Sequence, residues 1–303
     1  MTPCYRTLRE HTIESPDVRA VVLGPRAQAL NPLDQAPRLS QAAVDVLRAV
    51  EVVDERGDKR SIHIPRERPL SVVLDDRELV TLMTLGAAPE WLVLGYLRNQ
   101  RLIGEIAAID SVSVDWDSAT ARVQSRLVES ALGPPAAPAA RTACAMGTAF
   151  SDAMKAIEGM VLPDPGTASI SRSTLLSILE STRTLDDIHR AAGSVHGCAL
   201  YSSADLWLSV EDVSRHNGVD SVTGWMALHG IGGGDKILFT TGRLTGEMVM
   251  KAAFNGIPIL ITRNGVTDMG YRIAVQLHMS LFGRAANRRY LCYTGADRFD
   301  PDS

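Results

Sequence analysis

One cysteine, Cys144, stands among small residues in the stretch "ARTACAMGTAF", residues 140–150. It follows the proline- and alanine-rich segment "GPPAAPAA", lies close to Arg141, and precedes a helical pattern that begins near Thr148. A positive charge and a nearby helix N-terminus both lower a thiol pKa and favour the reactive thiolate. A free cysteine is also often a small buried hydrophobic residue. The residues alone leave both interpretations of Cys144 open.

A second cluster, "EDVSRHNGVD" at residues 211–220, lies between a strand pattern and a helix pattern. Its carboxylates flank Arg215, His216 and Asn217, so donors and acceptors alternate over a short segment. Such a set suits the edge of a heterocycle or a ribose. Alternatively, Asn217 or Asp220 caps a helix and the remaining residues form a solvated turn.

Two further segments have residues that suit an anionic ligand. "TTGR", Thr240 to Arg243, falls where a strand ends and a helix begins, and free backbone N–H groups, a helix dipole and an arginine there suit a phosphate. "LFGRAANRRY", residues 281–290, adds Arg284, Arg288 and Arg289 around a small-residue turn. The alternatives are a glycine turn with a solvent-facing arginine and a basic surface patch.

Metal chemistry is not indicated. His196 and Cys198 in "GSVHGCALY" invite comparison with the His-x-Glu of zinc deaminases, but Cys198 replaces the required glutamate and no Pro-Cys-x-x-Cys follows. The four cysteines form no Cys-x-x-Cys pair, so we expect no structural metal.

The patterns divide the chain into four parts. Residues 1–60 are an arm of uncertain structure, with a possible short helix at "SQAAVDVLRAVEVV". Residues 61–132 alternate strand patterns ("SIHIP", "PLSVVLDD", "RELVTLMT", "EIAAIDSVSVDW", "ATARVQSRL") with one apolar helix, "APEWLVLGYLRNQRLI", which predicts a small α+β subdomain. Residues 133–147 form a flexible linker that leads into the Cys144 loop.

Residues 148–303 predict an α/β layered domain. They are mainly helical to 192, a strand pair surrounds Ser203 to Asp205, and "GVDSVTGWMALHGI" is a helix. "KILFTT", "LTGEMVMKAAFNG" and "IPILIT" form a β-α-β unit with parallel strands and a right-handed crossover. Thr267 caps a further helix, and "SLFGR" and "RYLCYTG" are two more strands.

Bulk properties exclude several classes of function. Among 303 residues, 31 are basic and 35 acidic, so no global positive field attracts nucleic acid. Neither an apolar signal segment nor a run long enough to span a membrane is present, and we expect a cytoplasmic protein without disulfides.

The blocks "GSVHGCAL", "DVSRHNGVDSVTGW", "TTGRLTGEMVMKAAFNGIPILITRN" and "YTGADR" resemble those of the FdhD/NarQ family in order and spacing, and the resemblance covers roughly residues 61–298. It implies an accessory sulfurtransferase for formate dehydrogenase. In that family a cysteine desulfurase loads a persulfide onto a loop cysteine, and the sulfur passes to the molybdenum or tungsten of a transiently bound bis-molybdopterin guanine dinucleotide. It also implies a cytidine-deaminase-like α/β domain with a mixed sheet, a homodimer, and the formate dehydrogenase catalytic subunit as partner.

Carried over by position, the resemblance makes Cys144 the persulfide-bearing catalytic cysteine. It also implies a pocket for the guanine nucleotide ends of the cofactor, formed by His196, Asp212, Arg215, His216, Asn217, Thr241, Gly242, Arg243 and the loop Phe282, Gly283, Arg284, Ala285, Ala286 and Asn287.

The sequence also departs from the family pattern. The second cysteine of the usual Cys-x-x-Cys is Gly147, Ser214 and Ser221 stand where Gly and Lys are usual, and the loop from Phe282 to Tyr293 is two residues longer. With one cysteine missing, no partner thiol can resolve a persulfide as an internal disulfide.

The alternative function is therefore a non-catalytic cofactor-binding chaperone or insertion protein. A third function, a nucleoside-processing hydrolase, is disfavoured because the sequence lacks the metal ligands that such an enzyme needs. The sequence leaves open which enzyme is the client, whether the metal is molybdenum or tungsten, and what residues 1–60 contribute. It also leaves open whether Cys198 or Cys292 relays sulfur, and we expect both of these cysteines to be buried.

Overall fold

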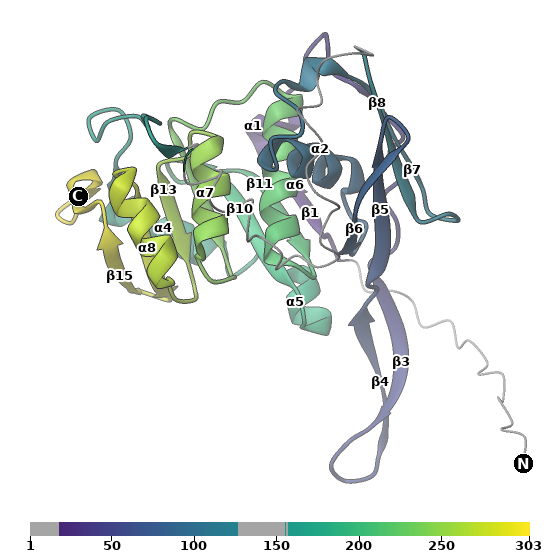
Figure 1. Cartoon of the computed structure of the whole chain (residues 1–303). Coiled ribbons are helices and arrows are strands. Elements are labelled where there is room, and N and C mark those ends of the chain that lie inside the picture. The colour runs from purple at the N-terminus through teal and green to yellow at the C-terminus, as the bar shows by residue number, and fades with distance from the viewer. Residues whose placement is uncertain (1–17, 127–154, 156) are drawn as a thin grey trace, which may run out of the picture.

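The computed structural model describes residues 18–126, 155 and 157–303. Within these ranges a five-stranded sheet lies beside a seven-stranded sheet, and helices pack between and around them (Figure 1). The whole segment 133–147, with Cys144, falls outside the described residues, so those domain boundaries stay predictions.

The smaller sheet has the strand order β2-β7-β8-β5-β6 and carries one helix, α2 (Pro89–Asn99). Its strands are β2 (Arg38–Leu39), β5 (Arg68–Leu74), β6 (Arg77–Thr84), β7 (Ile109–Asp115) and β8 (Thr120–Ser125). Asp75 and Asp76 form the two-residue turn between β5 and β6, both with positive φ, as a tight hairpin turn requires. The strands and the helix predicted between residues 61 and 130 are thus confirmed.

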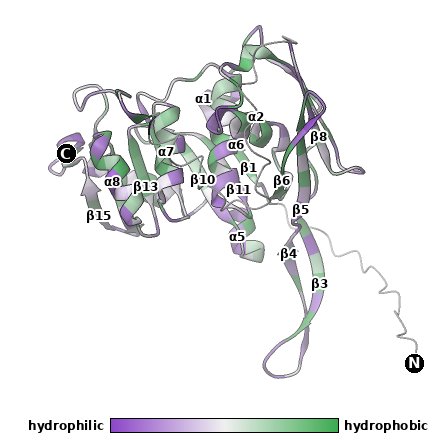
Figure 2. Ribbon diagram, viewed as in Figure 1, coloured by the Kyte–Doolittle hydropathy of each residue, from purple (hydrophilic) through white to green (hydrophobic). Residues whose placement is uncertain are grey.

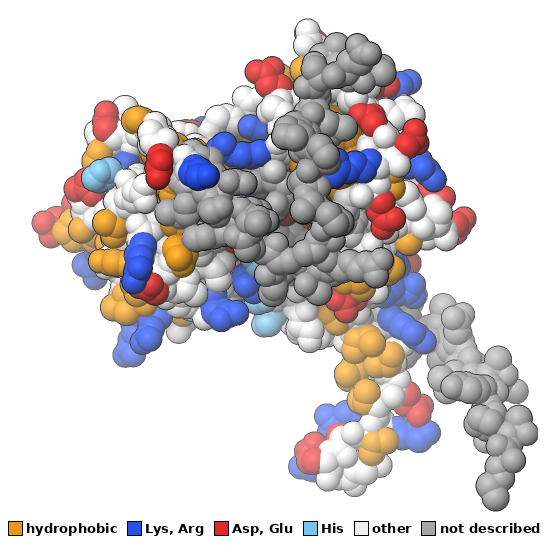
Figure 3. Space-filling view, in the orientation of Figure 1, with side chains coloured by type: hydrophobic (Ala, Val, Ile, Leu, Met, Phe, Trp, Pro, Cys, Tyr) orange, Lys and Arg blue, Asp and Glu red, His pale blue; other side chains and the backbone are white. Residues whose placement is uncertain are grey.

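The helix predicted within residues 40–53 is wrong. Residues Leu47–Val53 form strand β3, which pairs antiparallel with β4 (Lys59–Pro65) over seven residues. The β-branched residues Val50, Val52 and Val53 favour this strand, and its pairing with β4, the next strand along the chain, selects it over a helix. The ribbon projects from the body, with apolar and charged side chains along it (Figure 3).

The described part of the expected N-terminal arm also contributes to both sheets. β1 (Val21–Leu23), followed by the short helix α1 (Pro25–Gln28), pairs with β11 at one edge of the larger sheet. β2 pairs with β7 in the smaller one.

The larger sheet has the order β1-β11-β10-β12-β13-β14-β15. β12 (Lys236–Thr240), β13 (Ile259–Thr262) and β14 (Ser280–Ala286) are mutually parallel, whereas β10 (His196–Ser202), β11 (Asp205–Asp212) and β15 (Arg289–Thr294) join antiparallel. The predicted strand pair, the β-α-β unit and the final two strands are all confirmed, and so is the predicted α/β class with a mixed sheet.

Helices cover both faces of this sheet, which explains its apolar strands (Figure 2). α6 (Arg215–Leu228), α7 (Gly246–Phe254) and α8 (Asp268–Gln276) share one core with Leu200, Leu238 and Leu260. α4 (Arg172–Ser181) packs on the other face, against Phe239 and Ile261. Two short elements, β9 (Ile170–Ser171) and β16 (Phe299–Asp300), pair with each other, and α5 (Asp187–Ala192) precedes β10. Thr267 caps α8 as predicted, accepting a hydrogen bond from the Gly270 N–H.

Two glycines let α2 and α6 cross in backbone contact. A Cβ on Gly95 would lie 1.8 Å from the carbonyl oxygen of Asp220, and one on Gly224 would lie 1.9 Å from that of Trp91. No larger residue fits at this crossing, which joins the smaller sheet to the larger one. None of the helices in the described part of the chain is long and apolar enough to cross a membrane.

Candidate functional site

The strand ends that carry most of the described pocket candidates lie at one edge of the seven-stranded sheet. The carboxyl ends of the parallel strands β12, β13 and β14 lie there, together with the start of β10 and the end of β11. Arg243 follows β12, Arg263 follows β13, and Arg284 lies in β14 beyond its pairing with β13. The carboxyl edge of parallel strands is the usual ligand crevice of open α/β sheets.

The turns after β12 and β13 repeat the same local structure. Thr240 Oγ1 accepts a hydrogen bond from the Gly242 N–H at 3.1 Å, and Thr262 Oγ1 accepts one from the Asn264 N–H at 2.9 Å. The Thr241 N–H donates to the carbonyl of Gly197 at 2.9 Å. The N–H groups of Thr241 and Gly242 are therefore hydrogen-bonded within the protein, so the expectation of free N–H groups in "TTGR" is wrong for these two residues.

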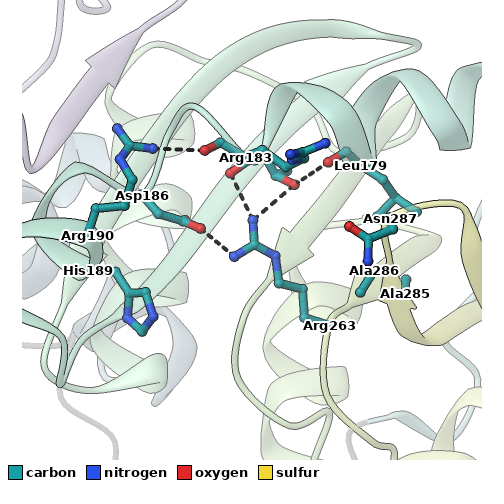
Figure 4. Close-up of a pocket in the computed structure, with 10 residues that line it drawn as sticks. Leu179, Arg183, Asp186, His189, Arg190, Arg263, Ala285, Ala286 and Asn287 are labelled. Atoms are coloured by element: carbon teal, nitrogen blue, oxygen red, sulfur yellow. Dashed lines mark hydrogen bonds and ion pairs between the residues drawn. The ribbon is translucent and has the colours of Figure 1, made fainter.

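A cavity of about 390 Å³ opens at this edge, between α4, α5 and the end of β14 (Figure 4). Its lining is basic, with three arginines against one aspartate, and consists of Leu179, Thr182, Arg183, Asp186, His189, Arg190, Arg263, Ala285, Ala286 and Asn287. Its volume lies within the range of small-molecule sites, roughly 300–1,000 Å³.

Two of these arginines are held in place before any ligand arrives. The Arg263 guanidinium forms an ion pair with Asp186 and donates to the Thr182 carbonyl oxygen at 2.9 Å. Arg190 donates to the Arg183 carbonyl oxygen at 2.8 Å and pairs with Asp187. A fixed guanidinium loses little conformational entropy when it binds an anion.

His196 and Thr241 lie together beside this cavity. His196 Nδ1 is 3.4 Å from Thr241 Oγ1, which also accepts the Gly197 N–H at 3.0 Å. A Cβ on Gly197 would lie 3.3 Å from Asp186 Oδ1, so this pair adjoins the cavity wall. Burial lowers the pKa of His196, and the nearby Arg215, His189 and Arg243 lower it further, so its ring is neutral near pH 7.

Arg215 and His216 begin α6. A Cβ on Gly242 would lie 2.6 Å from the Arg215 Cβ, so only glycine lets Arg215 pack over this turn. His216 Nε2 is 3.2 Å from Glu247 Oε2. Burial lowers the pKa of His216 to about 4, with Lys251 and Arg215 adding to the effect.

Asp212 and Asn217 have structural roles that the sequence did not suggest. Asp212 accepts hydrogen bonds from Thr84 Oγ1 at 2.6 Å, from the Leu85 N–H at 3.2 Å and from Asn217 Nδ2 at 2.8 Å. Asn217 also donates to the Met83 carbonyl oxygen at 2.7 Å. These bonds join the end of β11 to the end of β6, and the ligand role of both residues stays a prediction.

The predicted loop from Phe282 to Asn287 divides into a buried and an exposed part. Phe282 is fully buried, with its ring centroid 5.3 Å from that of Phe299, and Gly283 is buried beside Tyr293. Arg284 is exposed, and Ala285, Ala286 and Asn287 form one wall of the cavity.

Sequence reasoning missed the other wall of the cavity. Arg263 could have been found because it directly follows a predicted parallel strand. His189 and Arg190 come from α5 and Arg183 from the turn after α4. None of them belongs to a recognisable motif, and only the fold brings them to the cavity.

The three remaining cysteines differ in environment. Cys198 is buried, as expected, and burial raises its pKa to about 12. Cys292 is exposed, so its expected burial is wrong, because β15 is an edge strand. Cys4 lies outside the described residues. Within the described ranges, no three His, Cys, Asp or Glu side chains come together as metal ligands.

Sequence and structure comparisons identify relatives of the chain. The sulfur carrier protein FdhD of Listeria monocytogenes is 25% identical over 236 residues, covering 78% of this chain and 90% of that protein. Its Bacillus pumilus counterpart is 27% identical over 245 residues, covering 78% and 89%. A crystal structure of a protein assigned as a formate dehydrogenase accessory protein, from Desulfotalea psychrophila, matches with a TM-score of 0.67 at 23% identity, covering 85% of this chain and 99% of that one. The profile of the FdhD/NarQ family matches residues 65–300, and the chain belongs to this family.

Proposed function

We propose that the protein is a sulfur carrier in the maturation of formate dehydrogenase. It accepts sulfur from a cysteine desulfurase on Cys144 and passes it to the molybdenum or tungsten of bis-molybdopterin guanine dinucleotide, which it binds transiently as a substrate. Family membership and the names of its relatives support the sulfur-carrier role. The formate dehydrogenase catalytic subunit as client, a cytoplasmic location and a homodimer belong to the same proposal.

The proposal that the protein binds the cofactor rests on one observation. Arg243, Arg263 and Arg284 lie at the same edge of the sheet, beside a basic cavity. Arginine forks suit phosphate oxygens. The cavity is large enough for one nucleotide end of the cofactor and too small for the whole dinucleotide. We therefore place a nucleotide phosphate against Arg190 and Arg263, with the base or ribose toward His196, Thr241 and His216.

The loading step is a thiol exchange. The Cys144 thiolate attacks the outer sulfur of the desulfurase persulfide, the S–S bond breaks, and the desulfurase cysteine leaves as a thiolate. Cys144 then carries the persulfide. Its later release as sulfide requires two electrons, which an added thiol supplies when it attacks the Cys144 sulfur, forms a mixed disulfide with it and displaces the outer sulfur.

The alternative function is a cofactor-binding chaperone that moves no sulfur. The absence of a second cysteine at Gly147 favours it, and the buried Cys198, with a pKa near 12, cannot replace that cysteine as a thiolate. This alternative predicts cofactor binding that does not depend on Cys144.

Intact mass spectrometry after incubation with a cysteine desulfurase and cysteine decides between the two functions. The wild type should gain the mass of one sulfur, and Cys144→Ala should not. The control is Cys292→Ala, which removes the exposed thiol on β15 and should load normally. No gain on the wild type would contradict sulfur transfer, and a gain that survives in Cys144→Ala would assign it to another cysteine.

A further inference from the structure

A buried glutamate, Glu211, holds one wall of the cavity from behind. It is 1% exposed and lies at the end of β11, and both of its carboxylate oxygens accept backbone hydrogen bonds from the first turn of α5. Oε2 accepts the Ile188 N–H at 2.8 Å, and Oε1 accepts the His189 N–H at 3.0 Å.

Glu211 replaces the cap that α5 does not have of its own. Asp186 stands at the N-cap position, but its side chain makes no capping hydrogen bond and pairs with Arg263 instead. A helix of six residues with unbonded N-terminal N–H groups is not stable by itself. The position of α5 therefore depends on Glu211.

α5 contributes the side chains of His189 and Arg190 to the cavity. The backbone N–H of His189 is one of the two that Glu211 binds, and Arg190 is the next residue. The carboxylate itself does not line the cavity. Its effect on a ligand is therefore indirect, through the placement of these two side chains.

The charge of Glu211 is set by its surroundings. Burial raises its pKa to about 7, and the nearby Asp186 and Asp187 add to the rise, while the Ile188 and His189 N–H groups oppose it. The facing carboxylates are themselves paired, Asp186 with Arg263 and Asp187 with Arg190 and Arg19. His196 lies on the adjoining strand β10. Both charge states of Glu211 are thus populated near neutral pH.

We propose that Glu211 is a positioning residue for the cavity. Its ionised carboxylate holds the first turn of α5, and with it His189 and Arg190, in the arrangement that receives an anionic group of the ligand. When Glu211 takes up a proton, one oxygen becomes an O–H donor and no longer accepts its N–H bond. The turn is then released and ligand binding weakens. The link to binding rests on the proposed nucleotide site.

Two measurements on Glu211→Gln test this role. The first follows the amide resonances of Ile188 and His189 by NMR between pH 5.5 and 8.5 without ligand. In the wild type both should titrate with a midpoint near 7, and in Glu211→Gln they should not. Asp268→Asn, which changes an exposed carboxylate on α8, is the control and should behave as the wild type.

The second measurement is calorimetric binding of GMP at pH 6 and pH 8. The loss of one hydrogen bond predicts about fivefold weaker binding by the wild type at pH 6 than at pH 8. Glu211→Gln should bind about fivefold more weakly than the wild type at pH 8 and lose the part of the pH 6 to pH 8 difference that Glu211 causes. The GMP phosphate itself titrates at about pH 6 and affects both proteins, so the difference that remains in Glu211→Gln is subtracted from that of the wild type.

Stability separates positioning from a merely structural role. The pKa of Glu211 is raised from 4.5 to about 7, so the stability of the wild type should fall as the pH rises from 4.5 through 7, and Glu211→Gln should lack this dependence. Glu211→Gln also leaves one of the two N–H groups of α5 without an acceptor, which opposes a gain in stability at pH 8. A variant that still unfolds cooperatively at pH 8 but binds GMP more weakly supports positioning. Amides that titrate equally in both proteins, or unchanged GMP binding at pH 8, would overturn it. If the wild type does not bind GMP at either pH, the proposed nucleotide site fails, and with it the proposed effect of Glu211 on ligand binding. The amide titration alone decides whether Glu211 holds α5.

Discussion

The ammonium of Lys251 lies 2.7 Å from the carboxylate of Asp220, and both side chains are buried where α2, α6 and α7 meet. Asn99 donates to the other Asp220 oxygen at 2.7 Å, and Glu247 approaches the ammonium at 3.4 Å. Burial by itself lowers the pKa of Lys251, but the two carboxylates together raise it, which keeps the ammonium charged. A continuous polar chain thus runs from α2 through Lys251 to Glu247, which contacts His216.

Lys251→Met should destabilise the protein strongly, because it leaves the buried Asp220 carboxylate and the partly buried Glu247 carboxylate without their counter-ion. Removing one partner of a buried ion pair costs about 3–5 kcal/mol. Urea unfolding measures the loss, with Lys59→Met as the control, since Lys59 pairs with Glu51 on the exposed ribbon and should change little. Equal stabilities of the two variants would show that the buried pair does not stabilise the fold.

Gly224→Ala should destabilise the crossing of α2 and α6, although alanine normally favours a helix by about 1 kcal/mol over glycine. The added Cβ would lie 1.9 Å from the Trp91 carbonyl oxygen, so the helices must separate. Overpacking of this kind costs about 1–3 kcal/mol. Gly232→Ala is the matched control, because nothing lies within 4 Å of its added Cβ. A Gly224→Ala protein as stable as the wild type in thermal unfolding would contradict the close crossing.

The elements that the sequence predicted correctly are those with local signals. The β12-α7-β13 unit alternates apolar strands with one amphipathic helix, and the Thr267 cap depends only on neighbouring residues. β3 was missed because "SQAAVDVLRAVEVV" has apolar residues at helical spacing, which compete with the strand preference of Val50, Val52 and Val53. Pairing with β4 selects the strand.

The site divides in the same way. The sequence predicted that Arg243 follows a strand, and β12 does end at Thr240. The role of Arg243 in ligand binding stays a prediction. The hydrogen bond from Thr84 to Asp212 and the ion pair of Arg263 with Asp186 join residues far apart in the chain. No local pattern encodes such contacts, so the structural role of Asp212 and the wall formed by α5 could not be predicted.

The stability of the fold should fall in acid partly through His216. Its pKa of about 4 in the folded protein lies below the ordinary value of 6.5, so the unfolded chain takes up this proton first. The stabilisation is fully present above pH 6.5 and is lost as the pH falls toward 4, up to about 3 kcal/mol in total. Urea unfolding at pH 7, 5 and 4 should show a smaller acid loss in His216→Gln than in the wild type. The control is His278→Gln at an exposed position, which should follow the wild type. Parallel losses in all three proteins would mean that His216 titrates normally.

Arg263→Gln should weaken binding of GMP about tenfold or more, because a hydrogen bond to a charged group is worth about 1.5–3 kcal/mol. The Arg263 side chain lines the cavity and is held by Asp186 and Thr182, so its removal takes away a fixed positive charge. Arg272→Gln is the matched control, since Arg272 is an exposed arginine on α8 that pairs with Asp268. Guanosine, which has no phosphate, should bind the wild type and Arg263→Gln equally if Arg263 contacts the phosphate. An equal loss for GMP and guanosine would instead place Arg263 against the base or ribose and reverse the proposed orientation of the nucleotide.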